Sequence, residues 1–296
     1  MKKKIRKVSV YRVDHFMAEE TADGSLRIMQ SETEYDEDGR IIREAQFTGD
    51  GMMAEQYLMH YDYQGKPASM TILGEDGEAL EVRRNEYDAK GRLVRTSVEY
   101  MDGSLGLTEY IFDDWEMLTA RITYDEDRNI ESRESYLHHE GNLILTERFN
   151  EEDVISFRQE EIYTDGKHSE TRIWTAEEGE PYTRVIKLNE AGRKIAEMKY
   201  DSRDKLVERI TIEEDQDGKL LKVSEENPYR KTITEYHYDK DGNLTGQVEL
   251  AEDGSVHHQV VRTYNADMEP DRIRITFSRP DARLHNYSLE YDYEYY

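Results

Sequence analysis

A short turn motif, Tyr-Asp-x-x-Gly, recurs from one end of the 296-residue chain to the other and constrains the fold more than any other feature. Asp is favoured at the first position of a type I turn and Gly at the fourth, where a positive φ costs little. Between apolar runs, the motif therefore predicts tight β-hairpins. We interpret its residues as structural turn residues in four copies: Tyr35, Asp36 and Gly39; Tyr61, Asp62 and Gly65; Tyr87, Asp88 and Gly91; and Tyr238, Asp239 and Gly242.

Two interleaved series of turn signals set the spacing of the predicted strands. In the first series consecutive glycines lie 24 to 26 residues apart, with one interval skipped where Asp113-Asp114-Trp115-Glu116 stands. The second series falls between them, so a turn occurs about every 13 residues and leaves strands of about eight or nine residues. The first series is Gly39, Gly65, Gly91, Gly141, Gly166, Gly192, Gly218 and Gly242, and the second includes Gly24, Gly51, Gly77, Gly103, Gly179 and Gly254.

The segments between these turns alternate as half-buried strands do. Val94, Thr96 and Val98, for example, are separated by polar residues. Apolar residues do not recur at helical spacing, and a helix of more than about ten residues would run into the next turn signal. We therefore predict an all-β chain, with a single β-hairpin repeat domain over residues 1–296. About 20 or more strands would form one continuous antiparallel meander.

A flat sheet of this size is not expected, because neighbouring strands twist by about 20–25° and open sheets beyond about ten strands curl, split or close. We expect a curved or spiralling elongated sheet whose inner face carries the Tyr and aliphatic side chains. Its two edge strands would be free to pair with another chain. Lysines at residues 2–4 defend the first edge, whereas the last edge predicts a homodimer contact through Tyr287, Leu289, Tyr291 and Tyr293.

Disorder is the main alternative for so polar a chain. Hydrophobic and charged residues each make up 36% of it, against about 45–50% and about 25% in ordinary globular domains. Disordered acidic chains are poor in aromatic residues. This chain has 22 Tyr, 6 Phe and 2 Trp, set in alternating patterns. A thin folded sheet with one modestly apolar face fits this composition better.

The net charge of −26 limits the choice of partners. It argues against direct binding of nucleic acid or an anionic membrane, both of which would repel such a surface, and it permits a basic protein partner. The basic run at residues 2–7 resembles the start of a signal peptide, but the strand-like residues 8–15 do not continue one. We expect a cytoplasmic protein, or a surface or periplasmic one if a leader has been removed. The chain contains no Cys, so it has neither disulfides nor thiolate sites.

The acidic turn residues have two readings, calcium ligands or turn chemistry. Segments such as Asp36-Glu37-Asp38-Gly39 resemble part of a calcium loop, but none continues to the Glu that would supply a bidentate ligand. We favour turn chemistry and expect no metal site and no cofactor. The repeated aspartates are Asp36, Asp62, Asp88, Asp113 and Asp239.

A basic residue follows the turn glycine in several copies. Cross-strand charge pairing is the simpler interpretation, and a groove for an anion or acidic peptide is the alternative. The residues are Arg40, Lys66, Arg92, Arg193 and Lys219.

The pairs His138-His139 and His257-His258 put one imidazole on each face of a strand, so we interpret them as ordinary strand residues. Trp115 and Trp174 are expected in the core, with exposed binding aromatics as the alternative.

No enzyme signature is present in the sequence. It lacks the nucleophile elbow, the phosphate-binding loop, the dinucleotide fingerprint and the zinc-protease helix motif. The 66 acidic residues are too many to single out a catalytic pair. No long insertion interrupts the repeat. We therefore expect no catalytic activity.

The motif at residues 87–93, with its relatives at 35–41, 61–66 and 238–244, resembles the YD repeats of RHS-type bacterial proteins. That resemblance implies a spiralling ribbon of β-hairpins, which in large family members closes into a shell around a toxin. The hairpin spacing is also similar to MORN-like repeats, including those of small proteins proposed as antitoxins. We expect a non-enzymatic protein-binding or scaffolding protein, bacterial in origin. The alternative is an acidic inhibitor of a basic partner, acting as an antitoxin, an immunity protein or a mimic of nucleic acid.

Overall fold

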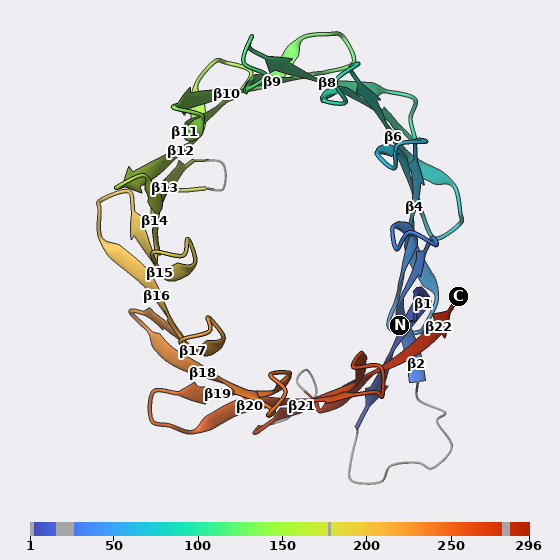
Figure 1. Ribbon diagram of the computed structural model, residues 1–296, viewed down its shortest axis with the longest axis vertical. Helices are drawn as coiled ribbons and strands as arrows, with labels where there is room; N and C mark the ends of the chain where they lie inside the picture. Colours follow the sequence, from blue (N-terminus) through green and yellow to red (C-terminus); the bar gives the residue numbers. More distant parts are fainter. Residues whose placement is uncertain (1–2, 16–26, 177–178, 280–284) are drawn as a thin grey trace. The chain divides into compact units, whose positions relative to one another are not determined.

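The computed structural model describes residues 3–15, 27–176, 179–279 and 285–296, and all regular secondary structure in these ranges is β-strand (Figure 1). The 22 strands belong to one antiparallel sheet. The predicted all-β antiparallel meander of more than 20 strands is therefore confirmed. Across the described ranges no helix is long and apolar enough to cross a membrane. The turn expected at Gly24 and Lys2 of the N-terminal edge lie outside the described residues.

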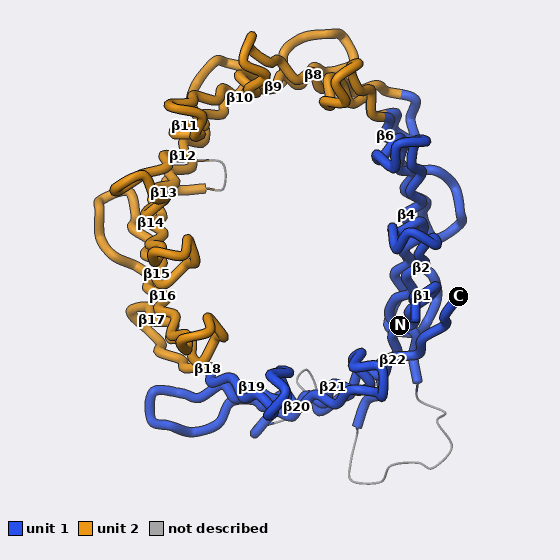
Figure 2. Tube along the Cα trace, viewed as in Figure 1, with its two compact units in different colours: residues 1–84, 99–103, 235–296 blue, residues 85–98, 104–234 orange. Residues whose placement is uncertain are grey.

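Two compact units divide the chain: unit 1 comprises residues 1–84, 99–103 and 235–296, and unit 2 comprises residues 85–98 and 104–234 (Figure 2). Unit 1 contains β1 (Ile5–Asp14), β2 (Arg27–Tyr35), β3 (Ile41–Phe47), β4 (Met53–Tyr61), β5 (Pro67–Leu73), most of β6 (Ala79–Tyr87), the end of β18 (Arg230–Tyr238), β19 (Leu244–Ala251), β20 (Val256–Tyr264), β21 (Pro270–Phe277) and β22 (Tyr287–Tyr295). Unit 2 contains most of β7 (Leu93–Tyr100), β8 (Leu105–Phe112), β9 (Leu118–Tyr124), β10 (Ile130–His139), β11 (Asn142–Phe149), β12 (Ile155–Thr164), β13 (Lys167–Thr175), β14 (Tyr182–Leu188), β15 (Lys194–Asp201), β16 (Leu206–Glu214), β17 (Leu220–Asn227) and the start of β18.

The first and last strands of the chain pair with each other inside unit 1. β1 and β22 share nine residue pairs, from Ile5 opposite Tyr295 to Asp14 opposite Tyr287 (Figure 1). β1 also pairs with β2, and β22 with β21. The prediction of an open sheet with two free edge strands is therefore wrong. An unpaired edge exposes a row of backbone donors and acceptors, and this long-range pairing satisfies both rows at once.

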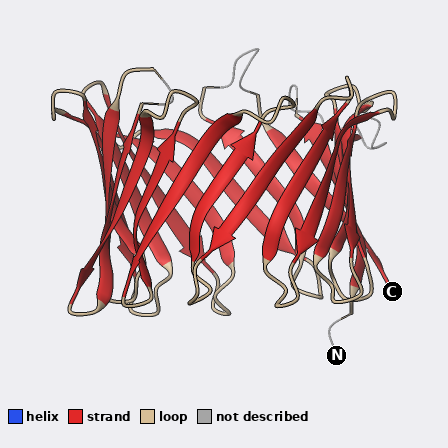
Figure 3. Cartoon of the chain, turned by 90° about the horizontal axis from the view of Figure 1, so that it is seen from above, coloured by secondary structure: helices blue, strands red, loops and turns tan. Residues whose placement is uncertain are grey.

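Unit 2 keeps the simplest hairpin order. From β8 to β17, consecutive strands pair antiparallel with each other. The strands of both units are joined by turns at alternate ends (Figure 3). We call one end the Tyr-Asp end, which carries the turns at 36–40, 62–66, 88–92, 113–117, 189–193, 215–219, 239–243 and 265–269. The opposite end carries the turns at 48–52, 74–78, 125–129, 150–154, 201–205 and 251–255.

A one-residue shift of register recurs shortly after the turns. In the β5–β6 pair, Leu73 faces Ala79 and Ile72 faces Glu81, so that Leu80 is an extra residue without a partner across the ladder. The β3–β4 and β8–β9 pairs shift in the same way. Such β-bulges increase the local twist of a strand and redirect a side chain. The strict alternation assumed from the sequence therefore fails at the start of many strands.

Few side chains are fully buried. Among the described apolar residues only Ala45, Val260 and Ile275 are buried. Beside the β1–β22 pairing, Val8 and Val10 share one face with Tyr293 and Tyr291. This agrees locally with the expected gathering of Tyr and aliphatic residues on one face. Charged residues occupy the other face there, so the stability of the sheet depends on cross-strand contacts rather than on a packed apolar core.

Buried glutamates bridge neighbouring strands in unit 2. Glu134 on β10 is only 5% exposed, and its carboxylate accepts hydrogen bonds at 2.7 Å from Arg121 on β9 and from Arg148 on β11. The Tyr136 hydroxyl donates to the same carboxylate. Burial opposes ionisation of Glu134, but the hydrogen bonds from Tyr136 and Arg148 outweigh it and lower the pKa of the carboxyl. One carboxylate thus holds three adjacent strands together.

Candidate interaction surfaces at the two ends of the strands

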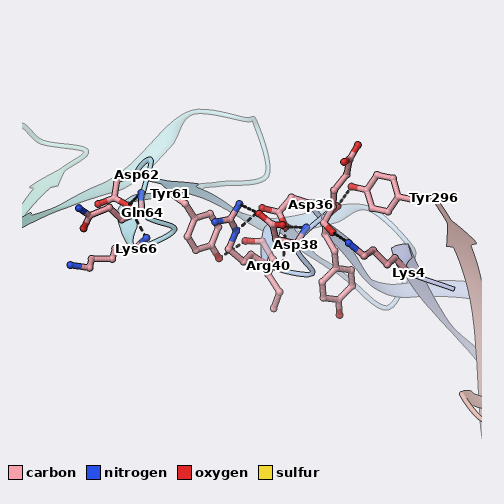
Figure 4. Close-up of polar contacts among 12 residues, drawn as sticks. Lys4, Asp36, Asp38, Arg40, Tyr61, Asp62, Gln64, Lys66 and Tyr296 are labelled. Atoms are coloured by element: carbon pink, nitrogen blue, oxygen red, sulfur yellow. Dashed lines mark hydrogen bonds and ion pairs between the residues drawn. The ribbon is translucent and has the colours of Figure 1, made fainter. Parts of the chain in front are cut away.

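The Tyr-Asp turns share one geometry, shown by the turn at residues 36–40 (Figure 4). The Asp36 amide donates to the Arg40 carbonyl and the Gly39 amide to the Asp36 carbonyl, both over 2.9 Å. The Asp36 carboxylate accepts from the amides of Asp38 and Arg40 at 2.9 Å and from Arg40 Nε at 2.7 Å. These bonds, led by the one from the Arg40 amide, lower the pKa of Asp36. The motif aspartate therefore binds its own turn.

Side chains of one Tyr-Asp turn also reach the next turn. The Arg40 guanidinium lies 5.0 Å from the centre of the Tyr61 ring. Its Nη1 is 2.7 Å from the point that a Cβ on Gly65 would occupy. The Tyr61 hydroxyl donates to the Ile41 carbonyl over 2.7 Å. We call this arrangement of Arg40, Tyr61, Gly65 and the Ile41 carbonyl, with its counterparts elsewhere, the turn staple. Figure 4 shows Arg40 and Tyr61 side by side.

Parts of the turn staple recur along both units. Arg92 lies 4.5 Å from the centre of the Phe112 ring, which precedes Asp113 where other copies have Tyr. Arg193 Cζ lies 2.6 Å from the position of a Cβ on Gly218. Three more tyrosine hydroxyls donate to a carbonyl near the start of an earlier strand: Tyr163 to Leu143 at 3.2 Å, Tyr264 to Leu244 at 2.8 Å and Tyr293 to Pro270 at 2.8 Å. The motif therefore joins successive repeats as well as closing hairpins.

The structure places the predicted turn residues at equivalent points. Tyr35, Tyr61, Tyr87 and Tyr238 are each the last residue of a strand. The carboxylates of Asp62, Asp88 and Asp239 accept from the amides two and four residues later, as Asp36 does. Gly39, Gly65, Gly91 and Gly242 have φ between 80° and 88°. Sequence reasoning missed the staple itself. The sequence does contain a sign of it: the tyrosine lies 20 residues after the residue whose carbonyl accepts its hydrogen bond, as Tyr61 does after Ile41.

The sequence offers two alternatives for the motif residues, a calcium site and a groove for an anion or acidic peptide. Within the described ranges, no group of three or more His, Asp or Glu side chains could hold a metal ion. Arg40 and Arg92 bind the aspartates of their own turns, and Arg193 binds Glu214 at 2.7 Å. The simpler interpretation predicted charge pairs between strands; Arg40 and Arg92 instead pair within their own turns, and Arg193 pairs with a residue of β16. His139 is exposed and His138 half-buried on adjacent positions of β10.

Both ends of the chain meet the first Tyr-Asp turn. Lys4 Nζ donates to the Glu37 carbonyl over 2.6 Å, and the Tyr296 hydroxyl donates to the Tyr35 carbonyl over 2.5 Å (Figure 4). The Tyr296 amide donates to the Lys4 carbonyl at 3.1 Å. This turn therefore fixes the ends of β1 and β22 beside each other.

Charged side chains line one face of the β1–β22 pairing. Lys7 Nζ lies 3.0 Å from Glu294 on β22 and 3.1 Å from Glu32 on β2. Hydrogen bonds with Glu294 and Glu32 raise the pKa of Lys7. Arg27 bridges Glu290 at 3.0 Å and Asp292 at 3.1 Å. These residues tie β22 to the two strands at the start of the chain.

This pairing occupies the strand edge that the sequence offered as a dimer contact. Tyr291 lies opposite Val10 and Tyr293 opposite Val8, while Leu289 and Tyr287 lie opposite Arg12 and Asp14 on the same strand. The premise of a free C-terminal edge is wrong, because residues at the other end of the chain cover it. A dimer through these four residues would have to displace β1.

An apolar patch lies at the opposite end of unit 1. The bulge residue Leu80 is 36% exposed, and Tyr100 and Met101 are 45% and 68% exposed. The Met101 amide donates to the Leu80 carbonyl over 2.9 Å, which brings the turn at 100–103 against β6. The Leu80 side chain covers Gly74, with Cδ2 3.3 Å from the position of a Cβ there. We call Leu80, Tyr100 and Met101 the Leu80 patch.

Acidic residues occupy the two turns beside the Leu80 patch. Four exposed carboxylates belong to the two turns that form it: Glu75, Asp76, Glu78 and Asp102. Sequence reasoning missed this surface, although a signal was present. Tyr100 and Met101 are large apolar residues inside a turn segment, Tyr100-Met101-Asp102-Gly103, where small or polar residues are usual.

Two single aromatic residues project from Tyr-Asp turns. Trp115 is 83% exposed and Tyr63 is 94% exposed. The prediction that Trp115 lies in the core is wrong, because it occupies the third position of the 113–117 turn rather than a strand position. Its amide donates to the Asp113 carboxylate at 3.0 Å, which fixes the turn and directs the indole outward. Trp174 on β13 is half-buried.

A shallow pocket of about 280 Å³ lies at the opposite end of unit 2. It is formed by residues 206–209 at the start of β16 and by residues 226–228, which span the end of β17 and the residue after it. Arg209 faces Glu226 across the ladder at this point. The pocket lining includes the side chains of Glu208, Arg209 and Glu226.

No family model matches the chain. No curated protein matches it in sequence. Among solved structures, a porin-like protein from Bacteroides uniformis is similar over 99% of both chains, with 12% identity and a TM-score of 0.36. A porin-like protein from Bacteroides vulgatus is similar over the same shares with 12% identity and a TM-score of 0.23. The TcdB2-TccC3 structure is matched over 92% of this chain and 21% of that one, with 12% identity and a TM-score of 0.24. Scores this low carry no functional inference.

Proposed function

We propose that this chain is a non-catalytic repeat protein that binds a basic protein partner through the Leu80 patch. The observation that carries the proposal is the exposure of Leu80, Tyr100 and Met101 within one contact-linked site. Isolated exposed apolar residues are normal on a surface, but a contiguous apolar site rimmed by polar residues is typical of an interface. Tyr and Met are among the residue types enriched in interface cores.

The carboxylates beside the patch favour a partner with a basic surface. Glu75, Asp76, Glu78 and Asp102 are exposed beside it, and the chain as a whole carries a net charge of −26. Such a field accelerates association with a basic protein and disfavours acidic ones. The similarity of the Tyr-Asp motif to RHS-type YD repeats also supports a scaffold built from hairpins over one built around a catalytic site.

The proposal is tested by capture from a bacterial lysate on the immobilised chain, with the double variant Leu80→Ser/Met101→Ser. The matched control is Met52→Ser/Val256→Ser, which removes two exposed apolar residues at the same end of unit 1. We expect the patch variant to lose affinity for a captured protein by about tenfold or more, and the control to keep it. Equal binding by both variants would contradict the assignment of this surface.

An acidic inhibitor that acts mainly by charge is the second candidate, favoured by the large negative net charge. A partner held mainly by charge dissociates when salt is raised from about 0.05 to about 0.5 M, because the Debye length then falls below the separation of surface charges. A partner seated on the Leu80 patch stays bound at the higher salt. Measuring the affinity at both salt concentrations separates the two functions.

A further inference from the structure

We propose that β22 is an exchangeable strand, and that β22 of a second copy of this chain takes its place between β1 and β21, giving a reciprocal dimer. This inference is independent of the Leu80 patch. It starts from an imbalance in the contacts of β22. β22 shares nine residue pairs with β1 but only four with β21, the strand that precedes it in the sequence. β22 is therefore held mainly by the far end of the chain.

The connections on both sides of this pairing are long. Residues 278–286 separate β21 from β22, and residues 15–26 separate β1 from β2. The turns at the Tyr-Asp end, such as 36–40, have five residues or fewer between closely paired strands. Exchange of an identical element between two copies of a chain is a low-cost route to dimers, and a connection of this length allows β22 to reach the sheet of a neighbour.

The side chains of β1 and β21 match those of β22 in a single register. On one face, Tyr291 and Tyr293 lie opposite Val10 and Val8, and Leu289 lies opposite Ile273. A slip of one residue would bring the acidic residues of β22 onto this apolar face, so the register is strongly specified.

The other face of β22 is recognised by charge. Glu294 contacts Lys7 and Arg6, and Asp292 contacts Arg27. Glu290 contacts Arg27 at 3.0 Å and Arg272 at 2.7 Å. The position between β1 and β21 thus presents cations from three strands to the carboxylates of β22. A second copy of the chain carries the same β22 sequence and satisfies every one of these contacts.

Exchange preserves the contacts of the monomer, so the balance between monomer and dimer is set by protein concentration and by the connections. In either state, the edges of β1 and β21 are covered. A chain whose β22 has left without replacement exposes both edges and recruits a second copy. The dimer contact expected from the sequence is thereby placed in the same residues, with β1 of the second copy as the partner.

The experiment mixes two full-length variants, Ser9→Cys and Asp292→Cys, whose positions face each other across the pairing. The natural chain has no Cys, so any disulfide reports on these two sites. After incubation at high protein concentration and oxidation, we expect a disulfide-linked heterodimer of twice the 35.0 kDa chain mass. Its yield should rise with protein concentration.

Two controls make the result decisive. The double variant Ser9→Cys/Asp292→Cys should form its disulfide within one chain at low concentration, which shows that the geometry permits the bond. A mixture of Ser31→Cys and Gln46→Cys, which face each other across the short β2–β3 hairpin, should give little heterodimer. If the double variant closes its bond and the Ser9→Cys and Asp292→Cys mixture yields no more heterodimer than this hairpin control, strand exchange is excluded.

Discussion

The two ends of the strands close their hairpins with the same turn but use different side chains around it. At the Tyr-Asp end, the Asp88 carboxylate accepts from the amides of Lys90 and Arg92 and also from Arg92 Nε. At the opposite end, the Asp201 carboxylate accepts from the corresponding amides of Arg203 and Lys205. Arg92 additionally stacks on Phe112, one Tyr-Asp turn further along. The backbone turn is common to both ends, and the turn staple belongs to the Tyr-Asp end.

The difference follows from the residue after the turn glycine. Three Tyr-Asp turns place Arg there, whereas the opposite end has residues such as Met52, Glu78, Ser104, Val154 and Lys205 at the equivalent position. The guanidiniums of Arg40, Arg92 and Arg193 reach the next turn at the Tyr-Asp end. The comparison teaches that side chains at the Tyr-Asp end join successive repeats to each other, whereas the opposite end exposes acidic and apolar groups such as Glu78 and Met101.

The largest effect that tests this comparison is expected from adding a Cβ to the turn glycines. Gly65 at the Tyr-Asp end and Gly77 at the opposite end have φ of 80° and 81°. Ala costs about 1–2 kcal/mol in this conformation. Only at Gly65 does the new Cβ meet a neighbour, Arg40 Nη1 at 2.7 Å, whereas nothing lies within 4 Å at Gly77. Displacing Arg40 from the Tyr61 ring costs about a further 0.5–1 kcal/mol.

The free energy of unfolding, measured by urea denaturation, should therefore fall more for Gly65→Ala than for Gly77→Ala. The two variants lie in neighbouring hairpins of unit 1, so each serves as the control for the other. Equal losses would show that the staple contributes nothing to stability and would remove the distinction between the two ends.

The turns and the strand count could be predicted because their causes are local. Asp36 and Gly39 fix a hairpin through contacts within five residues. The β1–β22 pairing has no such local signal, because it depends on contacts such as Arg6 with Glu294. An alternating strand looks the same whether its edge is free or covered by a distant segment.

The candidate sites were harder to predict for two further reasons. A bulge changes which face a side chain lies on without changing the composition of the strand, so the sequence around Leu80 carries no sign of its exposure. Trp115 was assigned to the core because it was read as a substitute for an aromatic strand residue, but it lies in the turn itself. The staple could have been predicted from the spacing of Tyr61 to the preceding turn, since each of its parts is visible in the sequence.

A smaller effect is expected from removing one hydroxyl. Tyr61→Phe deletes the hydrogen bond to the Ile41 carbonyl and leaves the ring beside Arg40 in place. Losing a half-buried hydrogen bond of this kind lowers the free energy of unfolding by about 1 kcal/mol. Tyr63→Phe, two residues away and 94% exposed, is the matched control and should change stability little. If both substitutions are neutral in urea denaturation, the staple depends on stacking and not on the hydroxyl.

The smallest effect concerns the acidity of the turn aspartates. Hydrogen bonds from the Arg92 amide and side chain lower the pKa of Asp88. The pKa of Asp201 is lowered by the Lys205 and Arg203 amides. A carboxyl whose pKa is lower in the folded state contributes stability above its unfolded pKa of about 3.9, and this contribution is lost as the pH falls through the folded value.

Arg92→Gln should therefore raise the pKa of Asp88 while leaving it below the unfolded value, because both amide hydrogen bonds remain. Asp201, in the same unit but at the opposite end, should titrate as before. Carbon-detected NMR titration of the two side-chain carboxyls follows both in one sample. A shift at Asp88 alone identifies the arginine as the feature that separates the two ends. If neither pKa changes, Arg92 acts only by stacking on the next turn, and the Asp88 carboxylate is stabilised only by the backbone amides of its own turn.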